Sequence, residues 1–316
     1  MRTARVNPVD ADQMQMNGDR AVAVLLHPSR PDALDAAVGF IAGIAERGFT
    51  AHVLAEAYDD VSSRVAQQDI EVGLLGARNP GLELVVVFGG DGSILRGAEQ
   101  ALPWDVPLLG VNLGHVGFLA ELEASEIDDL VDRVDSRAYE VEKRLTLAVE
   151  VHDPSGHLVW ESFAVNEVSV EKIARERMLE VLAIVDDQPL SRWGCDGILV
   201  STPTGSTAYA FSSGGPVMWP DVEAIELVPL SAHALFARPA VLSPKSTVDL
   251  VVSSERNIPA VVWADGARTV DAGPGSRVRL RRGAHDLLIA RLRPQPFTTR
   301  LVKKFGLPVE GFRGRG

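Results

Sequence analysis

The stretch Leu84-Val85-Val86-Val87-Phe88-Gly89-Gly90-Asp91-Gly92-Ser93 decides the fold of this chain. Its unbroken apolar run is typical of a strand covered on both faces of a sheet. The glycines that follow permit positive φ and a close approach of the backbone to a ligand. Ser93 begins a predicted helix, whose N-terminal N–H groups favour an anion. This order predicts a phosphate-handling loop at the carboxyl edge of a parallel sheet.

Asp91 is an unexpected residue in such a loop, because a carboxylate repels a phosphate. Two functions suit it: accepting a proton from an attacking hydroxyl, or holding a Mg²⁺ ion that bridges phosphates. The structural alternative is a tight turn, which also favours Gly and Asp. The strand–turn–helix context favours the functional interpretation. The loop is not a Walker A motif, since no Gly-Lys-Ser/Thr follows, and it is not the Rossmann Gly-x-Gly-x-x-Gly pattern.

Strands and helices alternate on both sides of this loop, which predicts a parallel sheet with helices on both faces. The polar segment 59–81 is ambiguous and is interpreted as a short helix plus a loop. The other predicted elements are strands at 21–26, 50–54 and 107–111, and helices at 31–47, 93–100 and 125–134, the last with Ser125 as N-cap.

The pattern changes near Tyr139 to short strands between turns, which predicts a β-rich, antiparallel second half. The predicted strands are 145–151, 163–170, 179–185, 198–201, 248–253, 261–263, 278–280 and 287–292. The fold class is therefore α/β, with an N-terminal parallel-sheet, Rossmann-like domain over 20–138 and a β-rich nucleotide-binding domain over 139–296. We expect the active site at the cleft between them. The basic tail 297–316 is either solvated or packs back onto the first domain through its apolar residues.

Composition narrows the classes of function. The formal net charge of −12 argues against nonspecific binding of nucleic acid, which needs clustered Lys and Arg. Cys195 is the single cysteine, so no disulfide can form within the chain, and a reducing compartment is expected. The N-terminus lacks a signal-peptide core, and no apolar run approaches the ~18–20 residues of a membrane span. These features predict a cytoplasmic protein without a membrane partner.

Two segments of the second half carry further polar groups. Asn166 and Glu167 supply one donor and several acceptors, which would suit ribose hydroxyls or an adenine amino group. Neighbouring strand residues point to opposite faces, so both reach one ligand only near a strand end or bulge; two exposed polar residues are the plain alternative. The segment from Cys195 to Tyr209 combines a strand, a hydroxyl-rich turn and a helix expected near Ser206, with a tyrosine ring able to stack on a base.

Gly-Gly-Asp-Gly alone resembles three families: NAD kinases, diacylglycerol-type lipid kinases and 6-phosphofructokinases. The whole set of segments closely resembles bacterial NAD kinases from about residue 21 to 316, and the other two families do not combine this loop with the segment Thr202–Tyr209. The segments that carry the resemblance are 89–93, Asn112-Leu-Gly-His-Val-Gly-Phe-Leu119, Asn166-Glu167, Asp196–Tyr209 and Lys304–Phe312.

The resemblance implies a role for individual residues. Asp91 would accept the proton of the ribose 2′-hydroxyl of NAD. Arg177 would face an anionic group, either within one subunit or across to a neighbouring one. Asp265 and His233 are left outside the predicted site, the first for its unremarkable flanks and the second as a packed histidine. The residues assigned to the substrate and nucleotide are Gly92, Arg96, Asn166, Glu167, Arg177, Asp196, Thr207, Ala208, Tyr209 and Ser212.

The resemblance also implies direct transfer of a phosphoryl group from ATP to NAD, with Mg²⁺ or another divalent cation on the donor, in a homodimer or homotetramer. Inorganic polyphosphate presents a similar terminal group and stays open as the donor. Two rival functions also stay open: a lipid kinase of the diacylglycerol type, and a non-catalytic module that senses NAD(P). The carboxylate of Asp91 disfavours the second, because a pure binder gains nothing from it.

Overall fold

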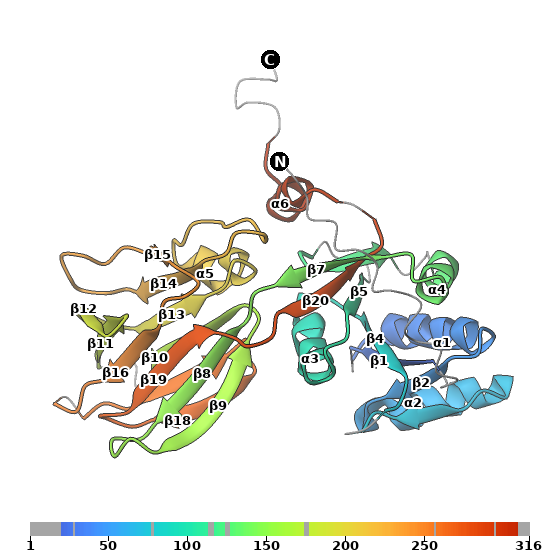
Figure 1. Ribbon diagram of the computed structural model, residues 1–316, viewed down its shortest axis with the longest axis horizontal. Helices are drawn as coiled ribbons and strands as arrows, with labels where there is room; N and C mark the ends of the chain where they lie inside the picture. Colours follow the sequence, from blue (N-terminus) through green and yellow to red (C-terminus); the bar gives the residue numbers. More distant parts are fainter. Residues whose placement is uncertain are drawn as a thin grey trace.

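The computed structural model describes residues 20–27, 29–76, 79–112, 117–123, 127–173, 177–255, 257–293 and 295–308. An eight-stranded sheet with its helices forms one part of the molecule, and two six-stranded sheets form the other (Figure 1). The predicted Ser125 cap, residues 113–116 of the Asn112–Leu119 motif and the tail beyond residue 308 lie outside these ranges. Within them, no helix is long and apolar enough to cross a membrane.

The eight-stranded sheet has the order β3-β2-β1-β4-β5-β20-β7, with β6 also paired to β5. All its pairs are parallel except β20 with β7, so the predicted parallel sheet is confirmed. Its strands are β1 (Ala21–Leu26), β2 (Thr50–Val53), β3 (Val72–Leu74), β4 (Leu82–Phe88), β5 (Leu108–Asn112), β6 (Ala120–Glu123), β7 (Glu140–Arg144) and β20 (Leu287–Arg291).

Helices cover both faces of this sheet, because successive residues of its buried strands point to opposite sides. Val86 and Phe88 of β4 pack with α1 and α4, while Val85 and Val87 pack with α3. The helices of this part are α1 (Pro31–Ala45), α2 (Ala55–Val65), α3 (Asp91–Ala101) and α4 (Ile127–Asp135), with 3₁₀ turns η2 (Ala66–Gln68) and η3 (Leu102–Trp104).

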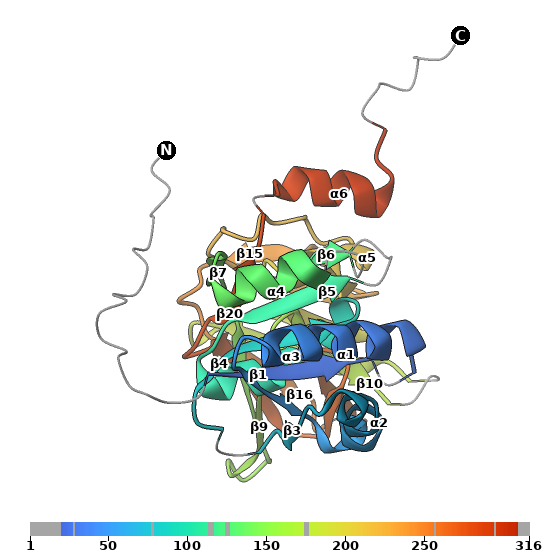
Figure 2. The same ribbon diagram turned by 90° about the vertical axis from the view of Figure 1, so that its right-hand side faces the viewer.

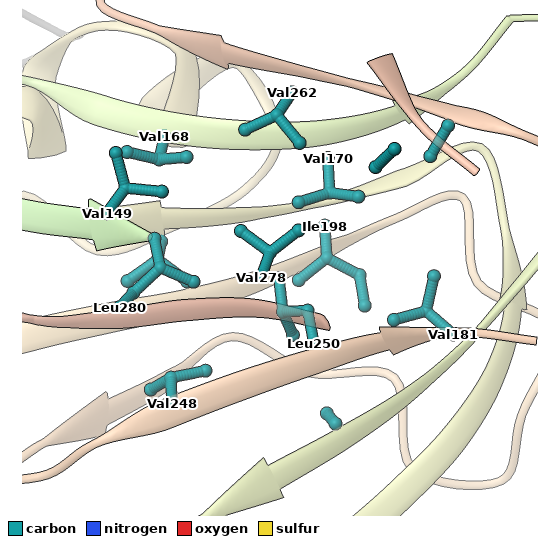
Figure 3. Close-up of a cluster of buried hydrophobic side chains, with 14 of the residues drawn as sticks. Val149, Val168, Val170, Val181, Ile198, Val248, Leu250, Val262, Val278 and Leu280 are labelled. Atoms are coloured by element: carbon teal, nitrogen blue, oxygen red, sulfur yellow. The ribbon is translucent and has the colours of Figure 1, made fainter. Parts of the chain in front are cut away.

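The β-rich part consists of two antiparallel sheets, in the orders β15-β14-β13-β10-β17-β18 and β12-β11-β16-β19-β8-β9. The inward residues of their strands are mainly valine, leucine and isoleucine, and they form one core between the sheets (Figure 3). Alternation is clearest in β8, where every second residue is buried. The predicted antiparallel, β-rich half is thus confirmed, but the strand expected at its end, 287–292, is β20 and belongs to the eight-stranded sheet. Its elements are β8 (Leu147–His152), β9 (Leu158–Ala164), β10 (Glu167–Lys172), β11 (Leu179–Val185), β12 (Gln188–Cys195), β13 (Gly197–Ser201), β14 (Ile225–Leu230), β15 (Ala240–Leu242), β16 (Val248–Val252), β17 (Ala260–Ala264), β18 (Arg268–Ala272), β19 (Arg277–Arg282), η5 (Gly205–Thr207) and α5 (Tyr209–Ser212).

Several expected boundaries are wrong. The helix after the glycine loop begins at Asp91, two residues before Ser93. The ambiguous segment 59–81 contains most of α2 and also strand β3. The expected strand 163–170 is interrupted at residues 165–166, because β9 ends at Ala164 and β10 starts at Glu167. The helix expected near Ser206 is a 3₁₀ turn followed by the single turn of α5.

The last described element is α6 (Phe297–Phe305), which lies on the outside of the molecule (Figure 2), near the place where the two parts meet (Figure 1). The ring of Phe305 contacts two other rings. Its centroid lies 6.0 Å from that of Phe118, which follows β5, and 4.6 Å from that of Phe211 of α5. The helix therefore packs on residues from both halves of the chain. The division into domains at residue 138 stays a prediction.

Candidate functional site

The Asp91 carboxylate is held by backbone N–H groups from another loop. Phe118 N–H donates to both carboxylate oxygens at 3.1 and 3.2 Å, and Leu119 N–H donates to Oδ1 at 3.1 Å. A methyl group at Gly117 would lie 2.4 Å from Oδ1, so this loop approaches Asp91 closely only because residue 117 is glycine. Lys304 of α6 places its Nζ 3.8 Å from Oδ2. Asp91 thus has a fixed orientation, with its side chain 29% exposed.

The glycines of the loop contribute through the absence of a side chain and not through a special backbone conformation. None of Gly89, Gly90 and Gly92 adopts positive φ, so that expectation is wrong. A methyl group at Gly89 would lie 2.4 Å from the Ser93 hydroxyl, whereas Gly90 and Gly92 face open space. The loop therefore leaves room for a ligand beside Asp91, at the N-terminus of α3, where N–H groups favour an anion.

Arg96 does not join this arrangement. Its guanidinium forms an ion pair with Glu56 of α2, at 2.5 Å, and both side chains are about half exposed. The resemblance placed Arg96 at the ligand, one helical turn from the loop, and it could not show the acidic partner on the neighbouring helix.

Asn166 and Glu167 lie at the junction between β9 and β10. Two neighbouring residues can both reach one ligand only at such a break in a strand. The carboxylate of Asp265 holds this junction: it accepts the N–H groups of Val165 at 2.9 Å, Asn166 at 2.7 Å and Glu167 at 3.3 Å. Arg268 adds a charged bond to the same carboxylate at 2.8 Å. Asp265, which the sequence left outside the predicted site, therefore fixes the position of the Asn166–Glu167 junction.

Glu167 is partly buried, with its Oε2 atom shielded from solvent, and it contacts the segment after η5. Burial, with the nearby charge of Asp265 adding to it, raises the pKa of Glu167 to about 8, and a hydrogen bond from the Tyr209 backbone N–H opposes the shift. Within the described ranges its Oε2 has no hydrogen-bond partner. The carboxylate of Glu167 can therefore form a hydrogen bond with a polar ligand next to Tyr209.

The hydroxyl-rich segment mostly bonds to the chain itself. Thr202 Oγ1 donates to the Val165 carbonyl at 2.6 Å, and Ser201 Oγ donates to the Asn166 carbonyl at 3.2 Å. A methyl group at Gly205 would lie 2.2 Å from the same Asn166 oxygen. The segment therefore fixes the position of the Asn166–Glu167 junction, and its buried hydroxyls are not available to a ligand.

A cavity of about 460 Å³ lies beside this segment, and Asp196, Tyr209 and Ser212 are among the residues that line it. Tyr209 is 39% exposed, so its ring is accessible to a ligand. Lys172 also lines the cavity and forms an ion pair with Asp196, which holds the pKa of Asp196 below its ordinary value. Three predicted residues thus share one hollow, and the carboxylate of Glu167 is linked to it through Tyr209.

The remaining predicted residues have other positions. Thr207 Oγ1 donates to the Thr204 carbonyl at 3.3 Å, and Ala208 N–H donates to the Gly205 carbonyl at 2.8 Å, so both stabilise the turn that carries Tyr209. Arg177 is exposed on the segment that leads into β11. His233 is exposed as well and pairs through its backbone with Gly194, so the expectation of a packed histidine is wrong.

Two contacts connect the Asp91 loop with the Asn166–Glu167 junction. Arg268 pairs through Nε with Glu99 of α3, at 3.2 Å, while its other end binds Asp265. On the outside, α6 contacts Phe118 and α5 through its rings. The helix that starts at Asp91 is therefore tied to the β-rich part on both sides.

A carboxylate held beside an open glycine loop at a helix N-terminus suits the transfer of a phosphoryl group to a hydroxyl, which is the chemistry of small-molecule kinases. Residues 41–139 match the family described as ATP-NAD kinase N-terminal domain, and residues 165–292 match the ATP-NAD kinase C-terminal domain. The NAD kinase of Cutibacterium acnes is 57% identical over 93% of this chain and 92% of its own length. NAD kinase 2 of Streptomyces coelicolor is 50% identical over 95% and 99%.

Solved structures show the same fold. Yeast NADH kinase complexed with NADH superposes with a TM-score of 0.80 at 22% identity, over 95% of this chain and 91% of that one. An NAD kinase from Archaeoglobus fulgidus in complex with ATP gives 0.64 at 24% identity, over 90% and 97%. The chain belongs to the NAD kinase family and is a phosphotransferase that acts on NAD.

Proposed function

We propose that this protein transfers the γ-phosphoryl group of ATP to the 2′-hydroxyl of the adenosine ribose of NAD, and that Asp91 accepts the hydroxyl proton. The observation that carries the proposal is the carboxylate of Asp91, fixed by two backbone N–H groups beside an open glycine loop. A new bond joins the ribose oxygen to the γ-phosphorus while the bond to the β-phosphate oxygen breaks. NADP and ADP leave, and the proton passes to the carboxylate.

The hydrogen bonds of Asp91 indicate which oxygen accepts the proton. Oδ1 receives N–H groups from Phe118 and Leu119, which occupy its two lone pairs. Oδ2 shares only the Phe118 N–H, at 3.2 Å, and keeps an acceptor site on the side of Lys304. We assign the base to Oδ2. A positioned base of this kind contributes about 10²–10⁴-fold to the rate.

Positive charge near Asp91 suits the donor phosphates. The N-terminal N–H groups of α3 and the ammonium of Lys304 lie at the same place, and both stabilise an anion. Within the described ranges, no cluster of three or more His, Cys, Asp or Glu residues could hold a metal ion. This fits a Mg²⁺ ion bound mainly by donor phosphates and at most one or two carboxylates, where it would neutralise the charge of the transferring group.

We propose that the β-rich part holds the acceptor nucleotide. Asn166 and Glu167 would bind ribose and base polar groups, and the cavity lined by Asp196, Tyr209 and Ser212 would hold the rest of the dinucleotide. The backbone of the Thr207–Ala208 turn would carry Tyr209 to the ligand. Roles for Gly92, Arg96 and Arg177 stay predictions, as do the cytoplasmic location and the homodimer or homotetramer.

The test is to incubate purified protein with NAD and Mg²⁺ and to measure NADP with either ATP or polyphosphate as donor. We expect NADP to form with ATP, and Asp91→Asn to slow the reaction by at least about 100-fold with the fold intact. NADP formation by Asp91→Asn at the wild-type rate would contradict the base assignment. Tight NADP binding without turnover by the wild type under any donor would favour a sensing module instead.

A further inference from the structure

The peptide group between Phe118 and Leu119 is bonded at both of its ends. Its N–H, from Leu119, donates to Asp91 Oδ1 at 3.1 Å. Its carbonyl, from Phe118, accepts from Arg300 Nη1 at 2.6 Å. One rigid, planar unit therefore lies between a guanidinium and the carboxylate that we assign as the base.

A second guanidinium repeats the contact one residue further on. Arg291 of β20 donates through Nη1 to the Leu119 carbonyl at 3.1 Å, and its Nε binds Glu142 of β7 at 2.9 Å. Arg291 and Arg300 are each only 4% exposed. Phe118 and Leu119, whose N–H groups bind Asp91, are thus themselves held through their carbonyl oxygens by Arg300 and Arg291.

We propose that Arg300, supported by Arg291, is a positioning residue for Asp91; this inference rests on the proposed function of Asp91. A charged donor on the carbonyl polarises the peptide and strengthens the bond that its N–H makes with the carboxylate. It also fixes the plane of the peptide, and with it the direction in which Asp91 Oδ2 points. Misplacement of a reacting group by about 1 Å can cost about 10²-fold in rate, so such control matters for turnover.

Arg300 reaches this place because α6 docks on the outside of the site. Phe297 and Phe305 of α6 pack on the ring of Phe118, with centroids at 5.7 and 6.0 Å. The same helix brings Lys304 to Asp91. The last described helix therefore completes a catalytic centre that begins more than two hundred residues earlier.

Arg300→Met tests the inference, because methionine fills the buried space without donating a hydrogen bond. We expect kcat to fall about 10- to 100-fold, with KM for NAD and ATP changed less than about twofold, since the binding groups are untouched. The matched control is Arg133→Met, which removes an arginine that binds the Leu292 carbonyl at 3.1 Å in the same part of the fold. This control should lose some stability and keep its kcat.

The coupling with Asp91 separates positioning from a general structural effect. In an Asp91→Asn background, Arg300→Met should reduce kcat by less than about twofold, because the path through the carboxylate is already lost. An equal reduction in both backgrounds, or an unchanged kcat in the single variant, would overturn the inference while the base assignment stands. Full activity of Asp91→Asn would overturn the base assignment itself.

Chemical rescue covers the case in which Arg300→Met fails to fold. Arg300→Ala leaves space for a guanidinium ion, and we expect added guanidinium at low millimolar concentration to restore part of kcat without a matching rise in melting temperature. Methylammonium, which lacks the planar fork, should restore less. Equal restoration by both ions, or none by guanidinium with a folded Arg300→Ala protein, would overturn the inference.

Discussion

Replacing Asp265 by asparagine should damage both stability and binding of NAD. The side chain is 1% exposed, and all its contacts are with donors. Oδ1 accepts three backbone N–H groups, while Oδ2 accepts Val165 N–H at 2.9 Å and Arg268 at 2.8 Å. Asparagine has nearly the same shape, yet its amino group must face donors in either orientation. The substitution therefore isolates the loss of acceptors.

The magnitude follows from the bonds at Oδ2. The better orientation of asparagine keeps its oxygen at the Oδ1 position and loses the two bonds at Oδ2, which are the shorter contact of Val165 N–H and the bond to Arg268. Each hydrogen bond to a charged group contributes about 1.5–3 kcal/mol, so two give about 3–6 kcal/mol. Burial raises the pKa of Asp265, which means that the fold carries a cost for its charge, and removal of that charge returns part of the loss. We expect the free energy of unfolding to fall by about 3 kcal/mol.

The functional effect comes from the junction that Asp265 holds. Asparagine releases Arg268 and weakens the hold on Val165, so the backbone of the neighbouring Asn166 and Glu167 is fixed less firmly. We expect KM for NAD to rise about tenfold while KM for ATP changes little. Urea unfolding gives the stability, and steady-state kinetics at 25 °C give the two KM values. A stability loss below about 1 kcal/mol, or an unchanged KM for NAD, would refute the argument.

Asp249→Asn is the matched control for this prediction. Asp249 is 2% exposed and binds Arg277 and Arg279 at 2.8–2.9 Å, in the β16–β19 sheet rather than at the junction. Its loss should destabilise the fold by a similar amount, because a buried pair is broken in both proteins. KM for NAD should stay at the wild-type value.

Two further predictions concern buried groups. Burial raises the pKa of Glu226 from 4.5 to about 7, so the folded state binds a proton that the unfolded state releases, and stability should fall by on the order of 3 kcal/mol as pH rises from 4.5 to 7. Glu226→Gln should flatten that profile in urea unfolding at several pH values, and an unchanged slope would contradict the assignment. Gly205→Ala should cost about 1–3 kcal/mol, because the added methyl meets the Asn166 backbone, which cannot yield. Gly273→Ala, in open space, is its control, and equal melting temperatures of the two variants would refute the steric argument.

Local pattern was sufficient for the elements around the glycine loop. The apolar run of β4 and the spacing of buried residues in α1 predicted both the elements and the layer in which they lie. The positions of β7 and β20 were harder to predict, because β20 joins the first sheet although the whole β-rich part lies before it in the sequence. Nothing in a short strand shows which distant strand it will pair with, so the place of β20 could not be predicted from periodicity.

The same limit applies within the site, because three of its carboxylates are held by backbone N–H groups, which every residue type except proline carries. Phe118 and Leu119 hold Asp91, residues 165–167 hold Asp265, and the Tyr209 N–H binds Glu167. No side-chain motif marks such donors. The acceptors do have a signature: the chain contains three Asp-Gly pairs, at 91–92, 196–197 and 265–266. Asp91 and Asp196 are proposed site residues and Asp265 holds the Asn166–Glu167 junction, so the pair at 265–266 carried the same signal as the other two.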